Sequence, residues 1–238
     1  MGPTAPAAPA ALTPRPPPAL ACLERLYGVG VQFSDGSWWA RVGEARLAYD
    51  DGRTKGAAEK LERPDLEDTF WPRYAIGPVH PVTSPGQDPG RARVDALFRF
   101  AYPARELVRV DFAGHAVRVQ RKVAPAFARV SARLATLVAA DASLAPFVAK
   151  LGGSFNARNI AGTDRPSAHS YGIAIDLNPD LSSYWRWDKS GWKNRIPQAI
   201  VDAFEAEGFI WGGRWFHFDT MHFEYRPELL DGRCYASP

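Results

Sequence analysis

The chain has 238 residues, enough for one domain with a sizeable core or for a small domain with an extension. Hydrophobic residues make up 46% and charged residues 23%, ordinary values for a globular protein, and no apolar run approaches the roughly eighteen residues of a membrane-spanning helix. The formal net charge is +3 without a concentrated run of Lys or Arg, so the composition does not favour a nucleic-acid partner.

The N-terminal end is rich in proline. Residues 1–20 contain seven of the 21 prolines, which predicts a disordered, polyproline-like tail, and they lack the apolar central run of a secretory signal. From about residue 20 to residue 51 the chain mixes glycine, aromatic residues and short apolar runs, a pattern typical of short strands joined by turns. The Pro/Gly-rich segment 84–91 is expected to be a loop.

The two cysteines, Cys22 and Cys234, lie near opposite ends of the chain, and their spacing fits no zinc-binding or redox motif. Two interpretations stay open: a disulfide that ties the ends together, or two unrelated thiols. A disulfide would indicate an oxidising compartment.

The middle and C-terminal parts predict a mixture of helices and strands. Residues 107–120, LVRVDFAGHAVRVQ, predict a β-hairpin, because apolar residues alternate on both sides of the turn sequence AGH. A second helix is expected to begin near Ile196, with Pro197 at its first position and Gly208 as its cap. Before it, a first helix carries an apolar stripe at steps of four and three residues, formed by Val123, Phe127, Val130, Leu134 and Leu137.

Two strand-like runs, YGIAIDL and TMHFEY, lie between and after these helices. Helices and short strands thus follow one another in an irregular order. We therefore predict an α+β fold with a small antiparallel sheet flanked by helices rather than repeating βαβ units.

The first strand run carries one acidic residue among small ones. Alternation places Asp176 on the same face as Gly172 and Ala174, opposite to the isoleucines and leucine that would enter the core. His169 lies just before the strand, where a loop could bring it back over Asp176. For this stretch taken alone, a hydrogen-bonded His–Asp pair without a metal is the more usual explanation.

The second strand run repeats the pattern. His222 and Glu224 share one face, and Asp219 precedes His222 by three residues. With His169 and Asp176, His222 makes a set of two imidazoles and one carboxylate, a typical catalytic zinc set that leaves a fourth position for water. A nearby carboxylate could take a proton from that water, and Asp219 is the first candidate and Glu224 the second. The spacing by itself does not prove that the two strands are neighbours.

The sequence also resembles a known family. SAHSYGIAIDLN, followed by WGGRWFHFDTMHFEYRPEL, is similar to the zinc peptidases of the D-alanyl-D-alanine carboxypeptidase family, which includes vancomycin-resistance carboxypeptidases and L-alanyl-D-glutamate endolysins. The similarity is dense over residues 152–230 and fainter over residues 64–150. The residues that match the family pattern are Ser167, His169, Gly172, Asp176, Asp219 and His222.

The resemblance implies roles for individual residues. His169, Asp176 and His222 would bind Zn²⁺, and Asp219 would be the general base, where many relatives carry Glu. Arg158 stands where relatives place an arginine that stabilises the developing oxyanion, although a surface arginine is the alternative. Ser167 would bind substrate or support a ligand, or make a local turn.

The implied function is hydrolysis of peptide bonds at D-amino acids in peptidoglycan stem peptides, in the periplasm or outside the cell, by a monomer. A catalytically silent binding module of the same fold and an L-alanyl-D-glutamate endopeptidase are the alternatives. A carboxypeptidase needs a cation for the free carboxylate, and Arg165 and Arg214 are the two candidates. The expected organisation is a tail over residues 1–20, an N-terminal extension with short strands over 21–120 and the catalytic domain over 121–238.

His217 and a group of aromatic residues each have a structural and a functional interpretation. His217 is expected to be structural, or else to orient substrate or Asp219. Between the two strand runs lies an aromatic cluster that would pack in the core or form a groove wall, made of Tyr184, Trp185, Trp187 and Trp192.

Overall fold

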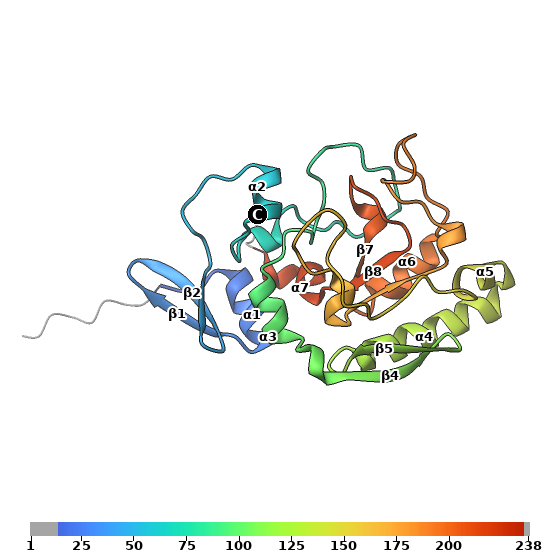
Figure 1. The fold of residues 1–238 in the computed structure, drawn as a ribbon, viewed down its shortest axis with the longest axis horizontal. Coiled ribbons are helices and arrows are strands. Elements are labelled where there is room, and N and C mark those ends of the chain that lie inside the picture. Colours follow the sequence, from blue (N-terminus) through green and yellow to red (C-terminus); the bar gives the residue numbers. More distant parts are fainter. Residues whose placement is uncertain (1–13, 236–238) are drawn as a thin grey trace, which may run out of the picture.

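The computed structural model describes residues 14–235 (Figure 1). Helices and three small antiparallel sheets alternate along this part of the chain, which confirms the predicted α+β class. The helices are α1 (Pro18–Tyr27), α2 (Ala57–Glu62), α3 (Asp95–Ala101), α4 (Ala124–Ala140), α5 (Ala145–Val148), α6 (Gln198–Glu205) and α7 (Pro227–Leu230). The strands are β1 (Gly30–Ser34), β2 (Ser37–Val42), β3 (Ala45–Ala48), β4 (Leu107–Phe112), β5 (His115–Gln120), β6 (Ala174–Asp176), β7 (Phe209–Trp211) and β8 (His222–Tyr225).

The N-terminal part agrees with the sequence expectation in its strands and differs in its first element. Strands β1, β2 and β3 form the expected antiparallel sheet. Residues 18–27, however, form helix α1, where the sequence suggested the end of a tail and the start of strands. Leu20, Leu23 and Tyr27 recur at helical spacing and are buried, and proline is compatible with the first turn of a helix. Residues 1–13 of the predicted tail lie outside the described residues.

Helix α1 is joined to the C-terminal end of the chain. A disulfide links Cys22 in α1 to Cys234, which decides between the two interpretations of the cysteines. Helices α1 and α7 contact each other and lie side by side in Figure 1. They are about two hundred residues apart in the sequence. The extension and the C-terminal segment therefore share one core cluster, which contains Leu20 of α1 and Phe223 of β8.

The hairpin and both predicted helices are present. Strands β4 and β5 pair antiparallel, and α4 buries Phe127, Val130 and Leu134 of its apolar stripe. Helix α6 begins one residue later than predicted, because Pro197 keeps an extended backbone and precedes the helix instead of opening it. The helix also ends before Gly208, whose φ of 90° turns the chain into β7.

The central sheet has the order β6-β8-β7 with antiparallel pairing (β7 and β8 are labelled in Figure 1). The pairing places Asp176 of β6 opposite His222 of β8. The other face of this sheet enters the core, where the rings of Phe223 and Phe204 stack with centroids 3.8 Å apart. The sheet thus has an apolar face that anchors it and a polar face that carries chemistry.

In residues 14–235, no helix combines the length and apolar character that a membrane crossing requires.

Candidate metal centre

Three potential ligand atoms converge where β6 ends and β8 begins. Nδ1 of His222 lies 3.0 Å from Oδ1 of Asp176, and Nε2 of His169 lies 3.2 Å from each of these two atoms. Antiparallel pairing brings the first two residues together, since it sets them directly opposite one another. The structure therefore assembles the three residues that the sequence marked as ligands.

The third residue, His169, is held by a short 3-10 helix, Ala168–Tyr171. The Ser167 side chain caps this helix by accepting a hydrogen bond from the His169 amide. Gly172 ends it with a φ of 68°, and a Cβ atom there would lie 2.8 Å from the amide nitrogen of Gln120 in β5. Glycine is required at this position on both counts, because the left-handed backbone and the close approach each disfavour a side chain.

In each imidazole, the ring nitrogen that does not face Asp176 has a hydrogen-bond partner of its own. Nδ1 of His169 lies 2.5 Å from the carbonyl oxygen of Ser154, and Nε2 of His222 lies 3.0 Å from Oε2 of Glu224. Such partners fix the tautomer and the orientation of a metal-binding histidine. Nε2 of His169 and Nδ1 of His222 are therefore the nitrogens that face Asp176.

Glu224 is buried among cations. Arg93 and Arg226 each place a guanidinium nitrogen 3.0 Å from its carboxylate. Burial would raise the pKa of Glu224, but Arg93, His222 and Arg226 outweigh it and lower the pKa well below its usual range. A carboxylate that is fully paired and hard to protonate is a poor proton acceptor, which argues against Glu224 as the general base.

The three converging atoms fit a Zn²⁺ ion. Two imidazole nitrogens and one carboxylate oxygen match the catalytic zinc donor set, and these atoms lie within 4.8 Å of one another. His169 and His222 are buried, so an ion would be shielded from water except on the pocket side. Burial would raise the pKa of Asp176, but the two imidazoles outweigh it and keep this carboxyl ionised, as a ligand requires.

Asp219 lies beside this cluster, and one of its carboxylate oxygens makes no hydrogen bond to the described residues. This oxygen, Oδ1, is buried. The backbone holds Asp219 in place, because its amide donates to the carbonyl of Gly212 at 3.0 Å and its carbonyl accepts from the His222 amide at 3.2 Å. Burial, and then the charge of Asp176, raise the pKa of Asp219 to about 7.

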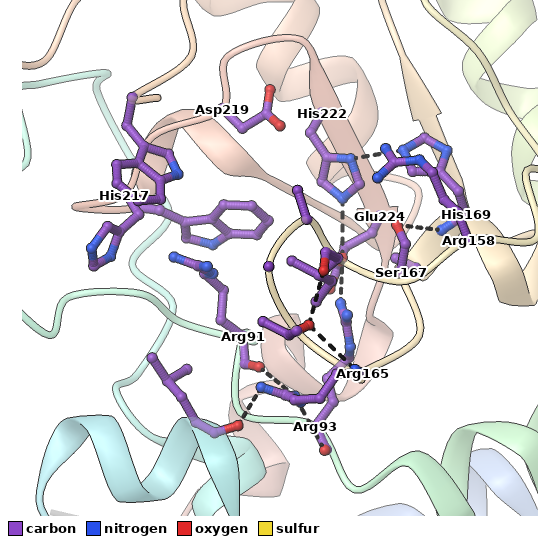
Figure 2. Close-up of a pocket in the computed structure, with 18 of the residues that line it drawn as sticks. Arg91, Arg93, Arg158, Arg165, Ser167, His169, His217, Asp219, His222 and Glu224 are labelled. Carbon is purple, nitrogen blue, oxygen red and sulfur yellow. Dashed lines mark hydrogen bonds and ion pairs between the residues drawn. The ribbon is translucent and has the colours of Figure 1, made fainter. Parts of the chain in front are cut away.

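The cluster opens into a pocket of about 570 Å³, part of whose lining Figure 2 shows. Asp219 and His222 lie on one side of the pocket, and helix α2 bounds it through Ala58, Leu61 and Glu62. Ser167 and Arg158 line the same pocket, and Arg158 is exposed there. The sequence did not single out Arg91 and Arg93, which also line the pocket, because a lone arginine in a loop carries no pattern.

The two arginines suggested for a free carboxylate have other partners. Arg165 lines the pocket but donates to the backbone carbonyls of Leu61, Arg91 and Arg93. Arg214 lies away from this pocket, with Nε 2.7 Å from Glu205. Neither side chain offers a free donor set to a substrate.

His217 and the aromatic residues have mixed surroundings. His217 lines the pocket and lies 2.7 Å from the buried carboxylate of Asp88 through Nδ1, with the ring of Trp185 beside it. Tyr184 and Trp185 form part of the pocket wall, whereas Trp187 is 69% exposed. Of the predicted cluster, two rings therefore border the site.

The α+β fold places two imidazoles and a carboxylate in the lining of one pocket, next to a carboxyl group with a free oxygen. These are features of the metallopeptidase class. Comparison with protein families agrees: residues 161–225 match the family model described as D-alanyl-D-alanine carboxypeptidase, a family of zinc metallopeptidases, which confirms the resemblance seen in the sequence. The matched segment contains His169, Asp176, Asp219 and His222. No solved structure matches this chain.

Proposed function

We propose that the protein is a zinc-dependent peptidase that hydrolyses peptide bonds at D-amino acids in the stem peptides of bacterial peptidoglycan, like a D-alanyl-D-alanine carboxypeptidase. The observation that carries this proposal is the convergence of His169, Asp176 and His222 beside the unpartnered Oδ1 of Asp219. The family match over residues 161–225 supports the substrate class.

In this proposal His169, Asp176 and His222 hold Zn²⁺ through the three converging atoms. Zinc in such a set acts as a Lewis acid that activates water and polarises an amide carbonyl. Asp219 accepts the proton of the attacking water at its free Oδ1 and later returns it to the leaving amine. Glu224 has no free oxygen for this task, because Arg93, Arg226 and His222 occupy both.

Arg158 is the proposed oxyanion partner. It lines the pocket, is exposed, and makes no side-chain hydrogen bond to the described residues, so its guanidinium can donate to a substrate oxygen. One hydrogen-bond donor to the developing negative charge contributes about 3 kcal/mol to transition-state stabilisation. Ser167 is proposed to position His169 through its cap and to border the substrate.

The proposed location is the periplasm or the outside of the cell. The substrate lies there, and the disulfide between Cys22 and Cys234 is compatible with an oxidising compartment. The division at residues 20 and 120 into tail, extension and catalytic domain, and a monomeric state, are kept as parts of this proposal.

The test is mass spectrometry of peptidoglycan fragments after incubation with the zinc-loaded protein, with the Asp219→Ala variant as control. Loss of one alanine that is absent in the control would support a carboxypeptidase, and split stem peptides would support an endopeptidase. Fragments left unchanged by the native protein would contradict both and favour a silent binding module.

A further inference from the structure

Four arginines line the pocket, and they differ in what they bind. Arg93 donates to Glu224 and to the carbonyl oxygen of Pro166, at 3.0 and 3.1 Å. Arg165 donates to the backbone carbonyls of Leu61, Arg91 and Arg93 and so links helix α2 to the loop that contains the two arginines. The two that remain are Arg158, the proposed oxyanion partner, and Arg91.

Arg91 has a donor without an acceptor. Its Nη1 is buried and makes no hydrogen bond within residues 14–235. Nη1 forms a long ion pair with Oδ1 of Asp88 at 3.5 Å, and this oxygen also accepts a hydrogen bond from the amide of His217 at 2.9 Å. The guanidinium as a whole donates no hydrogen bond within residues 14–235, and the part of it that lines the pocket can therefore donate to an acceptor that a ligand supplies.

The surroundings of Arg91 suit an anion. Its side chain is 23% exposed, and its guanidinium lies over the ring of Trp215 at 5.9 Å from the ring centroid. The ring and Asp88 limit where the guanidinium can turn, while the open side faces the pocket. An arginine held in this way presents its planar fork to a carboxylate, whose two oxygens match it.

The position of Arg91 indicates which end of a substrate it would meet. In Figure 2, Arg91 lies between His222 and Asp219 on one side and helix α2 on the other. The carbonyl of Leu61 in α2 accepts from Arg165, which ties the helix to the pocket wall. A peptide that crosses the metal cluster towards α2 therefore reaches Arg91 before it meets the residues of α2 that line the pocket.

We propose that Arg91 binds a carboxylate of the peptide substrate, and that this carboxylate is the free C-terminal one. The inference rests on the proposed peptidase function and deepens it, because an anchor for the terminal carboxylate selects cleavage next to the chain end. Arg91 is thus a specificity-determining residue, separate from Arg158, which faces the developing oxyanion.

The test compares three versions of one stem peptide that ends in D-alanyl-D-alanine: the free acid, its C-terminal amide, and a free acid whose internal glutamyl carboxylate is amidated. Each is assayed with the native protein, Arg91→Ala, Arg91→Lys and the control Arg109→Ala, an exposed arginine on β4 outside the pocket. Circular dichroism and zinc content check that each variant is folded and loaded.

We expect Arg91→Ala to lower kcat/KM for both peptides with a free C-terminus by about 10- to 100-fold, mainly through KM, and to leave the C-terminal amide unchanged. Arg91→Lys should keep part of the preference, and Arg109→Ala should behave as native. A loss confined to the peptides that retain the glutamyl carboxylate would show that Arg91 binds the internal carboxylate, which overturns the terminal assignment.

Equal losses on all three peptides would overturn the inference and make Arg91 a structural partner of Asp88. The proposed function fails in a different way, since the native protein would then cleave none of the three. The two failures are therefore distinguishable in one set of assays.

Discussion

The imidazole of His222 and the carboxylate of Glu224 lie 3.0 Å apart on one face of β8. Glu224 has no exposed surface and is held by Arg93 and Arg226, so the orientation of His222 depends on a chain of charged groups that extends into the core. The polar residues that alternate with the apolar ones on this strand thus serve two purposes, since one faces the cluster and the other positions it.

Replacing Glu224 by glutamine is expected to weaken zinc binding by about 10- to 100-fold, because a neutral amide orients His222 less strongly than a carboxylate does. Competition with a chromophoric chelator measures the zinc dissociation constant without any need for activity. Thermal unfolding of the metal-free variant provides the control for folding. An unchanged dissociation constant would show that Glu224 acts in packing alone.

The Asp219→Asn variant is expected to bind zinc normally and to lose about two to four orders of magnitude in rate, because the amide cannot accept the proton. Metal analysis and peptide hydrolysis, measured on the same sample, check both parts. Asp202→Asn, an exposed carboxylate on α6, is the matched control and should retain the native rate. Full activity in Asp219→Asn would assign the base to another group.

Zinc added to the metal-free protein is expected to raise Tm, because an ion that binds the folded state alone stabilises it by about 2.7 kcal/mol at a hundredfold excess over Kd. The expected stoichiometry is one ion per chain. His169→Ala should abolish the shift, whereas His80→Ala, an exposed histidine outside the cluster, should keep it. A full shift in His169→Ala would place the ion elsewhere.

The segment that carries α2 is expected to lose stability in acid. Lys55 lies 2.9 Å from Asp68, and Lys60 also pairs with this carboxylate. Burial would raise the pKa of Asp68, but Lys60 and Lys55 outweigh it and lower the pKa. A lowered folded-state pKa contributes stability above the unfolded value, and that stability is lost as the pH falls below about 4.

Urea unfolding at pH 7 and pH 3 measures this effect, and Asp68→Asn should reduce the difference between the two midpoints. The same difference in native protein and variant would exclude Asp68 as the titrating group.

Leu23→Ala is expected to destabilise the whole protein by about 2–5 kcal/mol, because Leu23 of α1 is completely buried in the shared core. Leu26→Ala, on the partly buried side of the same helix, should cost less. Chemical denaturation with two spectroscopic probes should give one transition for each variant. Separate unfolding of α1 would contradict a shared core.

The local features of this protein follow from its amino-acid sequence alone. The alternation in GIAIDL and in HFEY, the stripe of α4 and the AGH turn each follow from side-chain periods of 2.0 and 3.6, which act over a few neighbouring residues. The same local signals, together with the family pattern, marked His169, Asp176, Asp219 and His222. Helix α1 was missed because prolines at its start obscured a stripe of Leu20, Leu23 and Tyr27.

Features that depend on contacts between distant residues became visible only in the folded chain. The tertiary structure set Asp176 opposite His222, joined Cys22 to Cys234, buried Glu224 between two arginines, and left one nitrogen of Arg91 without an acceptor. Pairing register, burial and the pKa of a carboxyl group all depend on which segments pack together, and chain spacing does not encode that. For this reason the donor set and the preference for Asp219 over Glu224 could be inferred from the sequence, whereas the pairing of Glu224 with Arg93 and Arg226, which gives a physical reason for that preference, is seen only in the fold.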